Sequence, residues 1–271
     1  MTTAEPLLGL LAGAGRYPLS LLREARQRGF AMAAVSIEGV SVTAVDREAS
    51  PCLRLRVGQL AETARFFRGA GVRSVILAGG VPWKVLTIRP RLDWYAVRAL
   101  AAGLVGDDRL LRQVAAALEG FGLEVVEPGE LASGLVAQAG WQTGPSLPDR
   151  LAPLVEQAWD SATTLGRRDR GQAAVAFDDI VLVEDRHGTD RLLRRAGRLR
   201  RRGGVLAKVA KPDQDRRFDL PALGPATVTA AARTGVEAMV IQAGAGLVID
   251  RDEVETLATR LGVSVVALEN P

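Results

Sequence analysis

The chain has 271 residues, and its 35 lysines and arginines exceed its 31 aspartates and glutamates by only four. With 48% hydrophobic and 24% charged residues, it has a globular composition and is long enough for one large domain or two small ones. The single cysteine, Cys52, excludes an internal disulfide and a cysteine-rich zinc site, and it fits a reducing compartment. The single histidine, His187, excludes the multi-histidine cages of many metallohydrolases. Any metal must then be held largely by oxygen ligands, which favours magnesium or manganese.

The sequence contains no recognisable targeting or membrane-spanning segment. Residues 1–5 lack the basic start of a signal peptide, and no apolar run reaches the ~18–20 residues that a membrane helix needs. We therefore expect a soluble, cytoplasmic protein. The densest positive run has six arginines between positions 194 and 202. A solvated helix end is the favoured interpretation, and a patch for phosphates on nucleotides or on a membrane surface is the alternative.

The first half of the chain alternates predicted strands with predicted helices. Such alternation predicts a parallel, doubly wound α/β sheet whose ligands lie beyond the carboxyl ends of the strands. Asp107 and Asp108 are interpreted as acids that complement a helix dipole. Trp83, Trp94 and Tyr95 predict a loop with exposed apolar surface, used for packing between domains or for an acyl chain. We expect strands at 7–12, 30–37, 72–78 and 123–126, and helices at 18–28, 60–69 and 107–118.

Glycines and prolines interrupt the periodicity between residues 133 and 153. This predicts a linker, residues 133–153, between a domain at 1–132 and a second α/β domain at 154–271. In the second domain we expect helices at 154–165, 189–199, 225–233 and 251–261, and strands at 173–176, 180–184, 205–209, 238–242, 246–249 and 264–268.

A glycine-rich turn follows the first predicted strand. Gly13 and Gly15 would let backbone amides approach a phosphate at the start of the next helix, and Arg16 would add positive charge. A tight turn without a ligand explains the same residues equally well. The turn is not a dinucleotide fingerprint, because Pro18 stands where the third glycine would fall.

The densest cluster of functional side chains lies between residues 208 and 221, after a predicted strand and between prolines. A solvated loop is one explanation. We favour phosphoryl chemistry, because carboxylates bind Mg²⁺ and orient water while Lys and Arg neutralise phosphate oxygens. The candidate residues are Lys208, Lys211, Gln214, Asp215, Arg217 and Asp219.

A second turn between a strand and a helix carries Thr189 and Asp190. Both residues would serve as helix caps, and Asp190 would equally reach the same site from a neighbouring strand end. For His187 a surface position in this turn is the favoured interpretation.

Several motifs together resemble the LpxI-type UDP-2,3-diacylglucosamine pyrophosphatases, in family order and over nearly the whole chain. The long motif is Lys208-x-x-Lys211-Pro212-x-Gln214-Asp215-x-Arg217-x-Asp219-x-Pro221, followed by Gly224-Pro225. The shorter motifs are Gly13-x-Gly15-Arg16-x-Pro18, Gly58-Gln59-Leu60, Gly106-Asp107-Asp108, Gly171-Gln172-Ala173 and Gly188-Thr189-Asp190.

The resemblance implies an N-terminal Rossmann-like domain and a C-terminal catalytic domain in a homodimer. It also implies Mg²⁺- or Mn²⁺-dependent hydrolysis of UDP-2,3-diacylglucosamine to UMP and 2,3-diacylglucosamine 1-phosphate (lipid X), a step of lipid A synthesis in Gram-negative bacteria. By position, Asp219 corresponds to the essential acid of the family. The lipid-linked UDP-sugar suggests a peripheral contact with the inner membrane, and no nucleic acid is expected as a partner.

We accordingly assign Asp219, Asp215 and Asp190 to catalysis, with Asp219 and Asp215 as metal ligands. The residues expected to bind substrate are Lys208, Lys211, Gln214, Arg217, Thr189, Gly13, Gly15 and Arg16. Two positions depart from the family pattern: His187 replaces a glutamate, and Asp213 replaces a glycine. The alternative functions are a nucleotide-sugar or dinucleotide-dependent oxidoreductase and a non-catalytic nucleotide- or lipid-binding protein.

Overall fold

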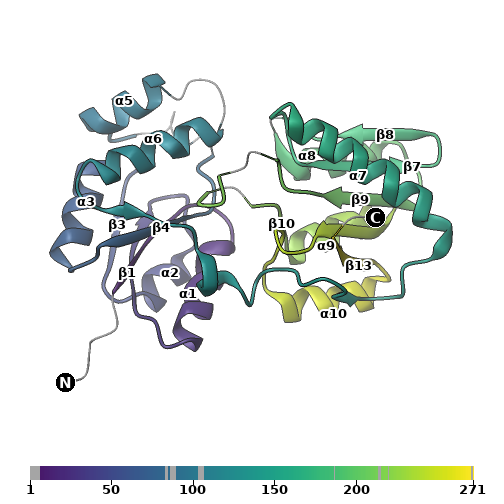
Figure 1. Cartoon of the computed structure of the whole chain (residues 1–271), viewed down its shortest axis with the longest axis horizontal. Helices are drawn as coiled ribbons and strands as arrows, with labels where there is room; N and C mark the ends of the chain where they lie inside the picture. The colour runs from purple at the N-terminus through teal and green to yellow at the C-terminus, as the bar shows by residue number, and fades with distance from the viewer. Residues whose placement is uncertain are drawn as a thin grey trace. The chain divides into compact units, whose positions relative to one another are not determined.

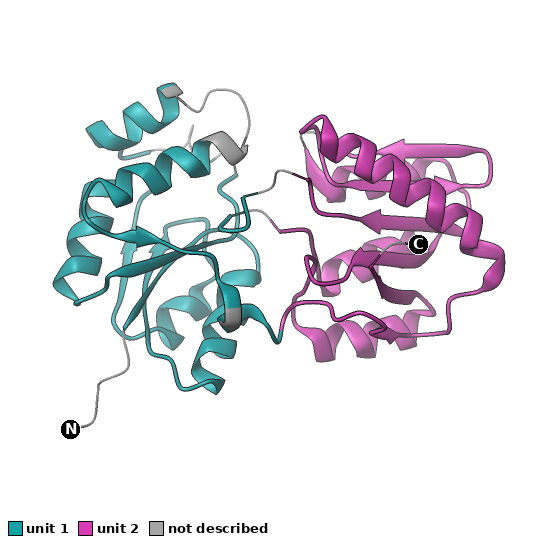
Figure 2. Cartoon of the chain, in the orientation of Figure 1, with its two compact units in different colours: residues 1–134, 215–219 teal, residues 135–214, 220–271 magenta. Residues whose placement is uncertain are grey.

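The computed structural model describes residues 7–82, 85, 90–102, 107–185, 187–212, 215–218, 220–269 and 271. It divides into two compact units (Figure 2). Unit 1 comprises Met1–Gly134 together with Asp215–Asp219, and unit 2 comprises Leu135–Gln214 and Leu220–Pro271. The loop predicted to carry the site chemistry therefore contributes residues to both units.

Unit 1 is built on a five-stranded, all-parallel sheet with the strand order β3-β2-β1-β4-β5 (Figure 1). This confirms the predicted Rossmann-like domain. The strands are β1 (Leu8–Ala12), β2 (Met32–Ile37), β3 (Cys52–Leu55), β4 (Ser74–Ala78) and β5 (Glu124–Val125). The helices are α1 (Tyr17–Gln27), α2 (Thr43–Glu48), α3 (Leu60–Gly69), α5 (Trp94–Ala102), α6 (Asp107–Glu119) and the 3₁₀ turn η1 (Gly129–Ala132).

Successive side chains of these strands point to opposite faces of the sheet and belong to two hydrophobic clusters, one on each face. Leu10 and Ile76 pack against α1, α2 and η1. Val35 and Leu77 pack against α3 and α6, where Phe67 and other large side chains are fully buried. The helices that connect the parallel strands cover both faces of the sheet, and burial on both faces explains why the strands are continuously apolar.

Unit 2 contains a six-stranded mixed sheet with the order β6-β13-β11-β9-β7-β8 and a short parallel pair, β10 and β12. Helix α7 covers one face of the large sheet, and α8, α9 and α10 cover the other. The strands are β6 (Gln142–Thr143), β7 (Ala173–Phe177), β8 (Ile180–Val183), β9 (Gly204–Lys208), β10 (Ala222–Leu223), β11 (Val236–Gln242), β12 (Leu247–Val248) and β13 (Ser264–Leu268). The helices are α7 (Ala152–Arg167), α8 (Gly188–Arg198), α9 (Pro225–Arg233), α10 (Arg251–Leu261) and the 3₁₀ turn η2 (Asp149–Leu151).

One sequence-based expectation is wrong in its local structure. Trp94 and Tyr95 begin helix α5 instead of lying in a loop, although their side chains are exposed as expected, 68% and 40% respectively. The helix forms because Asp93 accepts a hydrogen bond from the Ala96 amide at 2.9 Å, which satisfies a first-turn donor. Trp83 lies outside the described residues. The range 133–153, predicted as a linker, contains β6 and η2, and Leu151 in η2 is buried.

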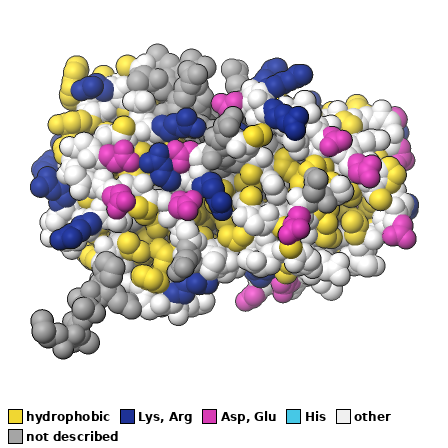
Figure 3. Space-filling model, viewed as in Figure 1, with side chains coloured by type: hydrophobic (Ala, Val, Ile, Leu, Met, Phe, Trp, Pro, Cys, Tyr) yellow, Lys and Arg dark blue, Asp and Glu magenta, His cyan; other side chains and the backbone are white. Residues whose placement is uncertain are grey.

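Both signs of charge are distributed over the surface. Figure 3 shows acidic and basic side chains next to one another over unit 1. Among the described residues, no helix is both long and apolar enough to span a bilayer.

Candidate functional site

The glycine turn after β1 packs closely against the turn after β4. The Gly13 amide donates to the Ala78 carbonyl at 2.7 Å, and the Ala14 amide donates to the Gly80 carbonyl at 2.7 Å. A Cβ on Gly13 would lie 2.5 Å from the Gly79 oxygen, so only glycine permits this approach. The amides of Gly13 and Ala14, in the turn that was one candidate for phosphate binding, therefore hydrogen-bond the end of β4 and the turn after it.

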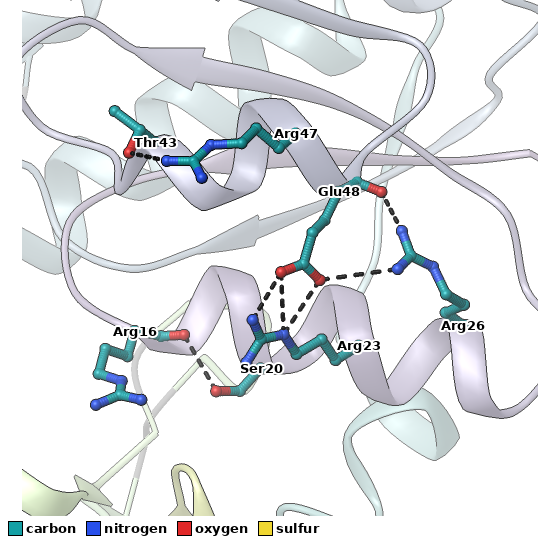
Figure 4. Close-up of polar contacts among 7 residues, drawn as sticks. All are labelled: Arg16, Ser20, Arg23, Arg26, Thr43, Arg47 and Glu48. Carbon is teal, nitrogen blue, oxygen red and sulfur yellow. Dashed lines mark hydrogen bonds and ion pairs between the residues drawn. The ribbon is translucent and has the colours of Figure 1, made fainter.

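Gly15 and Arg16 are exposed just before α1. Figure 4 shows Arg16 next to the first turn of this helix. Gly15 has φ +87°, and a Cβ there would meet nothing within 4 Å, so the backbone conformation alone favours glycine. Ser20 donates its hydroxyl to the Arg16 carbonyl at 3.2 Å. Arg23, one turn further on, is held by Glu48 of α2 at 2.6 Å, which fixes α1 against α2.

An apolar cavity of about 340 Å³ lies in unit 1 between the sheet and helices α3, α5 and α6. Its rim is exposed at Gly80, Pro82 and Leu92, whereas its floor is buried at Leu55 and Leu77. The volume falls within the roughly 300–1,000 Å³ typical of small-ligand pockets, and the position is the carboxyl edge of a parallel sheet.

In unit 2, Lys208 ends strand β9 and is buried, with only 7% of its surface exposed. Its ammonium donates to the Ala222 carbonyl at 2.6 Å. A buried ammonium needs such acceptors because burial without a partner is costly. Nearby, the Gln242 side chain at the end of β11 accepts from the Ala210 amide at 2.8 Å, which fixes the chain just after β9.

A buried carboxylate that the sequence reasoning did not select, Glu184, organises the same sheet edge. It follows β8, is 8% exposed, and accepts hydrogen bonds from the Gln172 amide and the Thr189 hydroxyl, both at 2.8 Å. Thr189 thus binds Glu184 instead of capping α8, and His187 is the N-cap residue. The Gln172 carbonyl accepts a hydrogen bond from the amide of Val209, the residue after Lys208, at 3.0 Å. Gln172 therefore connects Glu184 with the end of strand β9. The sequence signal was an acid placed directly between an apolar strand and a glycine-containing turn.

Two further candidates of unit 2 lie closer to solvent. Lys211 pairs with Asp169 at 3.0 Å, and its own side chain is 13% exposed. Asp190 is exposed in the first turn of α8.

Asp215 and Arg217 bind each other in unit 1. The guanidinium donates to both carboxylate oxygens of Asp215, at 2.9 and 2.8 Å, and to Glu119 of α6 at 3.1 Å. The hydrogen bonds from Arg217 are the main reason that the pKa of Asp215 lies below its usual value. The next residue, Phe218, packs against the hydrophobic cluster under α3 and α6. These contacts make residues 215–218 an anchored segment of unit 1.

The described residues include no group of three metal-ligating side chains. Both oxygens of Asp215 accept from Arg217, which leaves this carboxylate less available to a cation than the sequence suggested. Asp219, Gln214 and Asp213 lie outside the described residues. Mg²⁺ is commonly bound by one or two carboxylates together with substrate phosphates, so a three-residue protein cluster is not a requirement for it.

His187 lies in an exposed turn, as expected. Its amide donates to Asp185 at 2.9 Å, and this bond is the main reason that the pKa of Asp185 is lowered. The arginine run starts on α8, where Arg195 donates to the Val183 carbonyl at 3.0 Å, and continues to Arg201, which pairs with Asp179 at 2.5 Å. The contacts of Arg195 and Arg201 therefore agree with the favoured interpretation of the arginine run as a solvated helix end.

Comparisons with known proteins cover both units. The LpxI N-terminal domain matches residues 7–135, and the LpxI C-terminal domain matches residues 138–266. The chain belongs to the LpxI family. A curated relative from Caulobacter vibrioides, named UDP-2,3-diacylglucosamine pyrophosphatase LpxI, is 34% identical, and the alignment covers 97% of each chain. A solved biotin carboxylase domain of a thermophilic 2-oxoglutarate carboxylase covers 70% of this chain and 40% of its own, with 11% identity and a TM-score of 0.26, which is too low to support an argument.

The structure gives physical roles to three LpxI motifs. Gly58-Gln59-Leu60 lines the apolar cavity of unit 1. Gly171-Gln172 and Gly188-Thr189 meet at Glu184 in unit 2. A Cβ on Gly171 would approach Leu165 Cδ2 to 2.8 Å and the Glu184 carboxylate to 3.1 Å, so the glycine makes room for this carboxylate.

Proposed function

We propose that the chain hydrolyses the diphosphate of UDP-2,3-diacylglucosamine to UMP and 2,3-diacylglucosamine 1-phosphate, in lipid A biosynthesis. The observation that carries this proposal is the relative of that name, which is 34% identical over nearly the full length of both chains. In the reaction, water attacks one phosphorus, the bridging P–O bond breaks, and the displaced phosphate leaves with the electron pair. The water loses a proton to solvent or to a nearby base.

The described residues supply positive charge for this reaction from the end of strand β9 in unit 2. Lys208 and Lys211 flank the end of β9, and we assign them to the phosphate oxygens. The buried ammonium of Lys208 is suited to this role because its electrostatic effect is screened less than that of a surface lysine. We assign Asp219 to orienting the attacking water or binding the cation, on the family resemblance of its position. Asp215, held by Arg217, has instead a positioning role.

We also propose that the hydrolysis needs a divalent cation of the Mg²⁺ or Mn²⁺ type. A diphosphate and a carboxylate together provide the hard oxygen ligands that these ions prefer. When bound, such an ion would stabilise negative charge on the phosphate oxygens.

UMP release measured with added Mg²⁺, with Mn²⁺ and after treatment with EDTA tests this dependence. We expect turnover with either cation and its loss in EDTA, followed by recovery when excess Mg²⁺ is restored. Full turnover in EDTA would contradict the cation requirement while leaving the hydrolase assignment intact. The homodimer and the peripheral membrane contact stay predictions.

A further inference from the structure

We propose that Glu184 is a positioning residue for the hydrolysis, and that the Thr189 hydroxyl acts through it instead of binding substrate. This inference rests on the proposed function, because the reaction supplies the groups that must be positioned. Glu184 is assigned neither as the base nor as a ligand of the cation. It acts through the chain segments that its carboxylate joins.

The strand register brings the ends of several segments to one edge of the large sheet in unit 2. Ala173, at the start of β7, pairs with Lys208, at the end of the antiparallel strand β9. Ala174 pairs with Val183, the last residue of β8, because β7 and β8 are also antiparallel. The start of β7 and the ends of β8 and β9 therefore share one edge. Glu184, directly after β8, is thus placed at the edge that carries Lys208.

The two oxygens of the Glu184 carboxylate bind different segments. Oε2 accepts from the Gln172 amide, just before β7, and Oε1 accepts from the Thr189 hydroxyl in the first turn of α8, both at 2.8 Å. The Glu184 amide donates to the Ala173 carbonyl at 2.9 Å. One residue therefore ties the start of β7 and the start of α8 to the end of β8.

Each segment held by this carboxylate adjoins a residue assigned to the reaction. The Gln172 carbonyl accepts from the amide of Val209, which follows Lys208. Thr189 precedes Asp190 in the first turn of α8. A shift of Gln172 or Thr189 would displace these neighbours, and a displacement of about 1 Å can cost about a hundredfold in rate.

The surroundings of Glu184 suit positioning better than direct catalysis. Its side chain is buried, and each of its two oxygens already accepts a hydrogen bond from the protein. A Cβ on Gly171 would lie 3.1 Å from Oε2, so the chain passes close to the carboxylate as well. A general base needs an oxygen within hydrogen-bond reach of the proton that it removes. A carboxylate enclosed in this way is instead suited to fixing the segments around it.

Substitutions of Glu184 separate positioning from direct catalysis. Glu184→Ala removes both hydrogen bonds, and we expect kcat/KM for UMP release to fall by about ten- to a hundredfold. The amide of Glu184→Gln can accept from Gln172 and donate to Thr189, so we expect this variant to stay within about threefold of wild type. A base or a cation ligand would lose as much activity with glutamine as with alanine, and that result would overturn the inference. Glu184→Gln remains decisive if Glu184→Ala does not fold.

A double-mutant cycle tests whether Thr189 acts through Glu184. Thr189→Val keeps the shape of the side chain and removes the hydroxyl. If the hydroxyl acts only through Glu184, adding Thr189→Val to Glu184→Ala should change kcat/KM by no more than about twofold. Direct binding of substrate by the hydroxyl would make the two losses multiply, which would overturn the assignment of Thr189.

A stability control and hydrogen exchange complete the test. Leu257→Ala removes a buried side chain of α10, so it should lower the melting temperature but leave kcat/KM unchanged. In Glu184→Ala, or in Thr189→Val if the alanine variant does not fold, NMR should show faster deuterium exchange at the Gln172 and Val209 amides than in wild type. The amides of β11 provide the internal reference.

The outcomes separate this inference from the proposed function. A wild-type rate in folded Glu184→Ala, or unchanged exchange at both amides, would overturn the positioning role and leave the hydrolase assignment intact. A wild type that releases no UMP would overturn the hydrolase assignment, and faster exchange in the variant would then still support Glu184 as the residue that holds these segments.

Discussion

Cys52 illustrates how burial sets the chemistry of a single side chain. Burial, followed by the neighbouring charge of Asp46, raises the pKa of its thiol to about 11. The thiol therefore stays protonated at neutral pH, and thiolate is the reactive form.

We predict that iodoacetamide labels native Cys52 about a hundredfold more slowly at pH 8 than the same chain unfolded in denaturant, where the pKa is ~8.5. The native labelling rate should rise with pH up to about 11, as the thiol ionises. Asp46→Asn should increase the rate at pH 8, because it removes a charge that disfavours thiolate. Fast labelling of the native protein, independent of pH between 7 and 10, would contradict this account of the thiol.

Arg217 was predicted from the sequence to bind a phosphate. In the structure its guanidinium binds Asp215 and Glu119 within unit 1. Because Asp219 follows two residues later, we infer that Arg217 positions the segment that carries the essential acid.

The positioning role predicts that Glu119→Gln lowers kcat for UMP release while KM stays close to wild type, because Glu119 would act only through Arg217. Arg217→Ala should lower kcat further, up to about a hundredfold, since small displacements of catalytic groups are costly. Stability should change by no more than ~1 kcal/mol with Glu119→Gln, because the pair is exposed to solvent. The matched control is Glu124→Gln, an exposed glutamate that accepts from Ser74. A rise in KM without a fall in kcat for Arg217→Ala would show direct phosphate binding instead.

At the scale of elements, the long periodic segments could be predicted from the sequence. Helices α3, α9 and α10 have the predicted bounds, because each has a clear apolar period and a glycine or proline at or next to an end. Strand β13 also has its predicted bounds, because it is a short apolar run. Strand β3 and helix α2, four and six residues long, were missed because each is short and has few buried side chains, which leaves little apolar pattern. Helix α5 was missed because its aromatic residues follow a proline-containing stretch and face solvent.

The turn between β3 and α3 provides a prediction about stability. Gly58 has φ +93°, and a Cβ there would lie 2.5 Å from Leu92 Cδ2 and 3.1 Å from Leu92 Cα. Gly71 has φ +81° with nothing within 4 Å of such a Cβ, so it shares the backbone constraint without the contact.

We predict that Gly71→Ala lowers the free energy of unfolding by ~1–2 kcal/mol, the cost of a left-handed alanine. Gly58→Ala should lower it further, because the backbone at Leu92 must also move. Urea denaturation of both variants measures the difference. Equal destabilisation by the two substitutions would contradict this prediction, because it would show that the contact with Leu92 does not add to the cost of Gly58→Ala.

At the scale of the whole molecule, the Rossmann-like unit and the second α/β unit follow from the sequence pattern. The sequence pattern did not predict that residues 215–219 of the 208–221 loop belong to unit 1 while the rest belongs to unit 2. This assignment depends on contacts between residues far apart in the sequence, such as Arg217 with Glu119 and Phe218 with the α3–α6 cluster. For the same reason the buried Glu184 was not selected as a candidate. The net charge carried little information about function, since acidic and basic side chains lie next to one another over unit 1 on the face shown in Figure 3.

We propose above all that this chain hydrolyses UDP-2,3-diacylglucosamine through the loop that carries Asp219. The most direct measurement is UMP release from that substrate by the purified wild type and by Asp219→Ala, with Mg²⁺ present. We predict release of UMP and 2,3-diacylglucosamine 1-phosphate in equal amounts by the wild type, and loss of turnover by Asp219→Ala with its melting temperature and substrate binding retained. No UMP from the wild type, or near-normal UMP release by Asp219→Ala, would contradict the account.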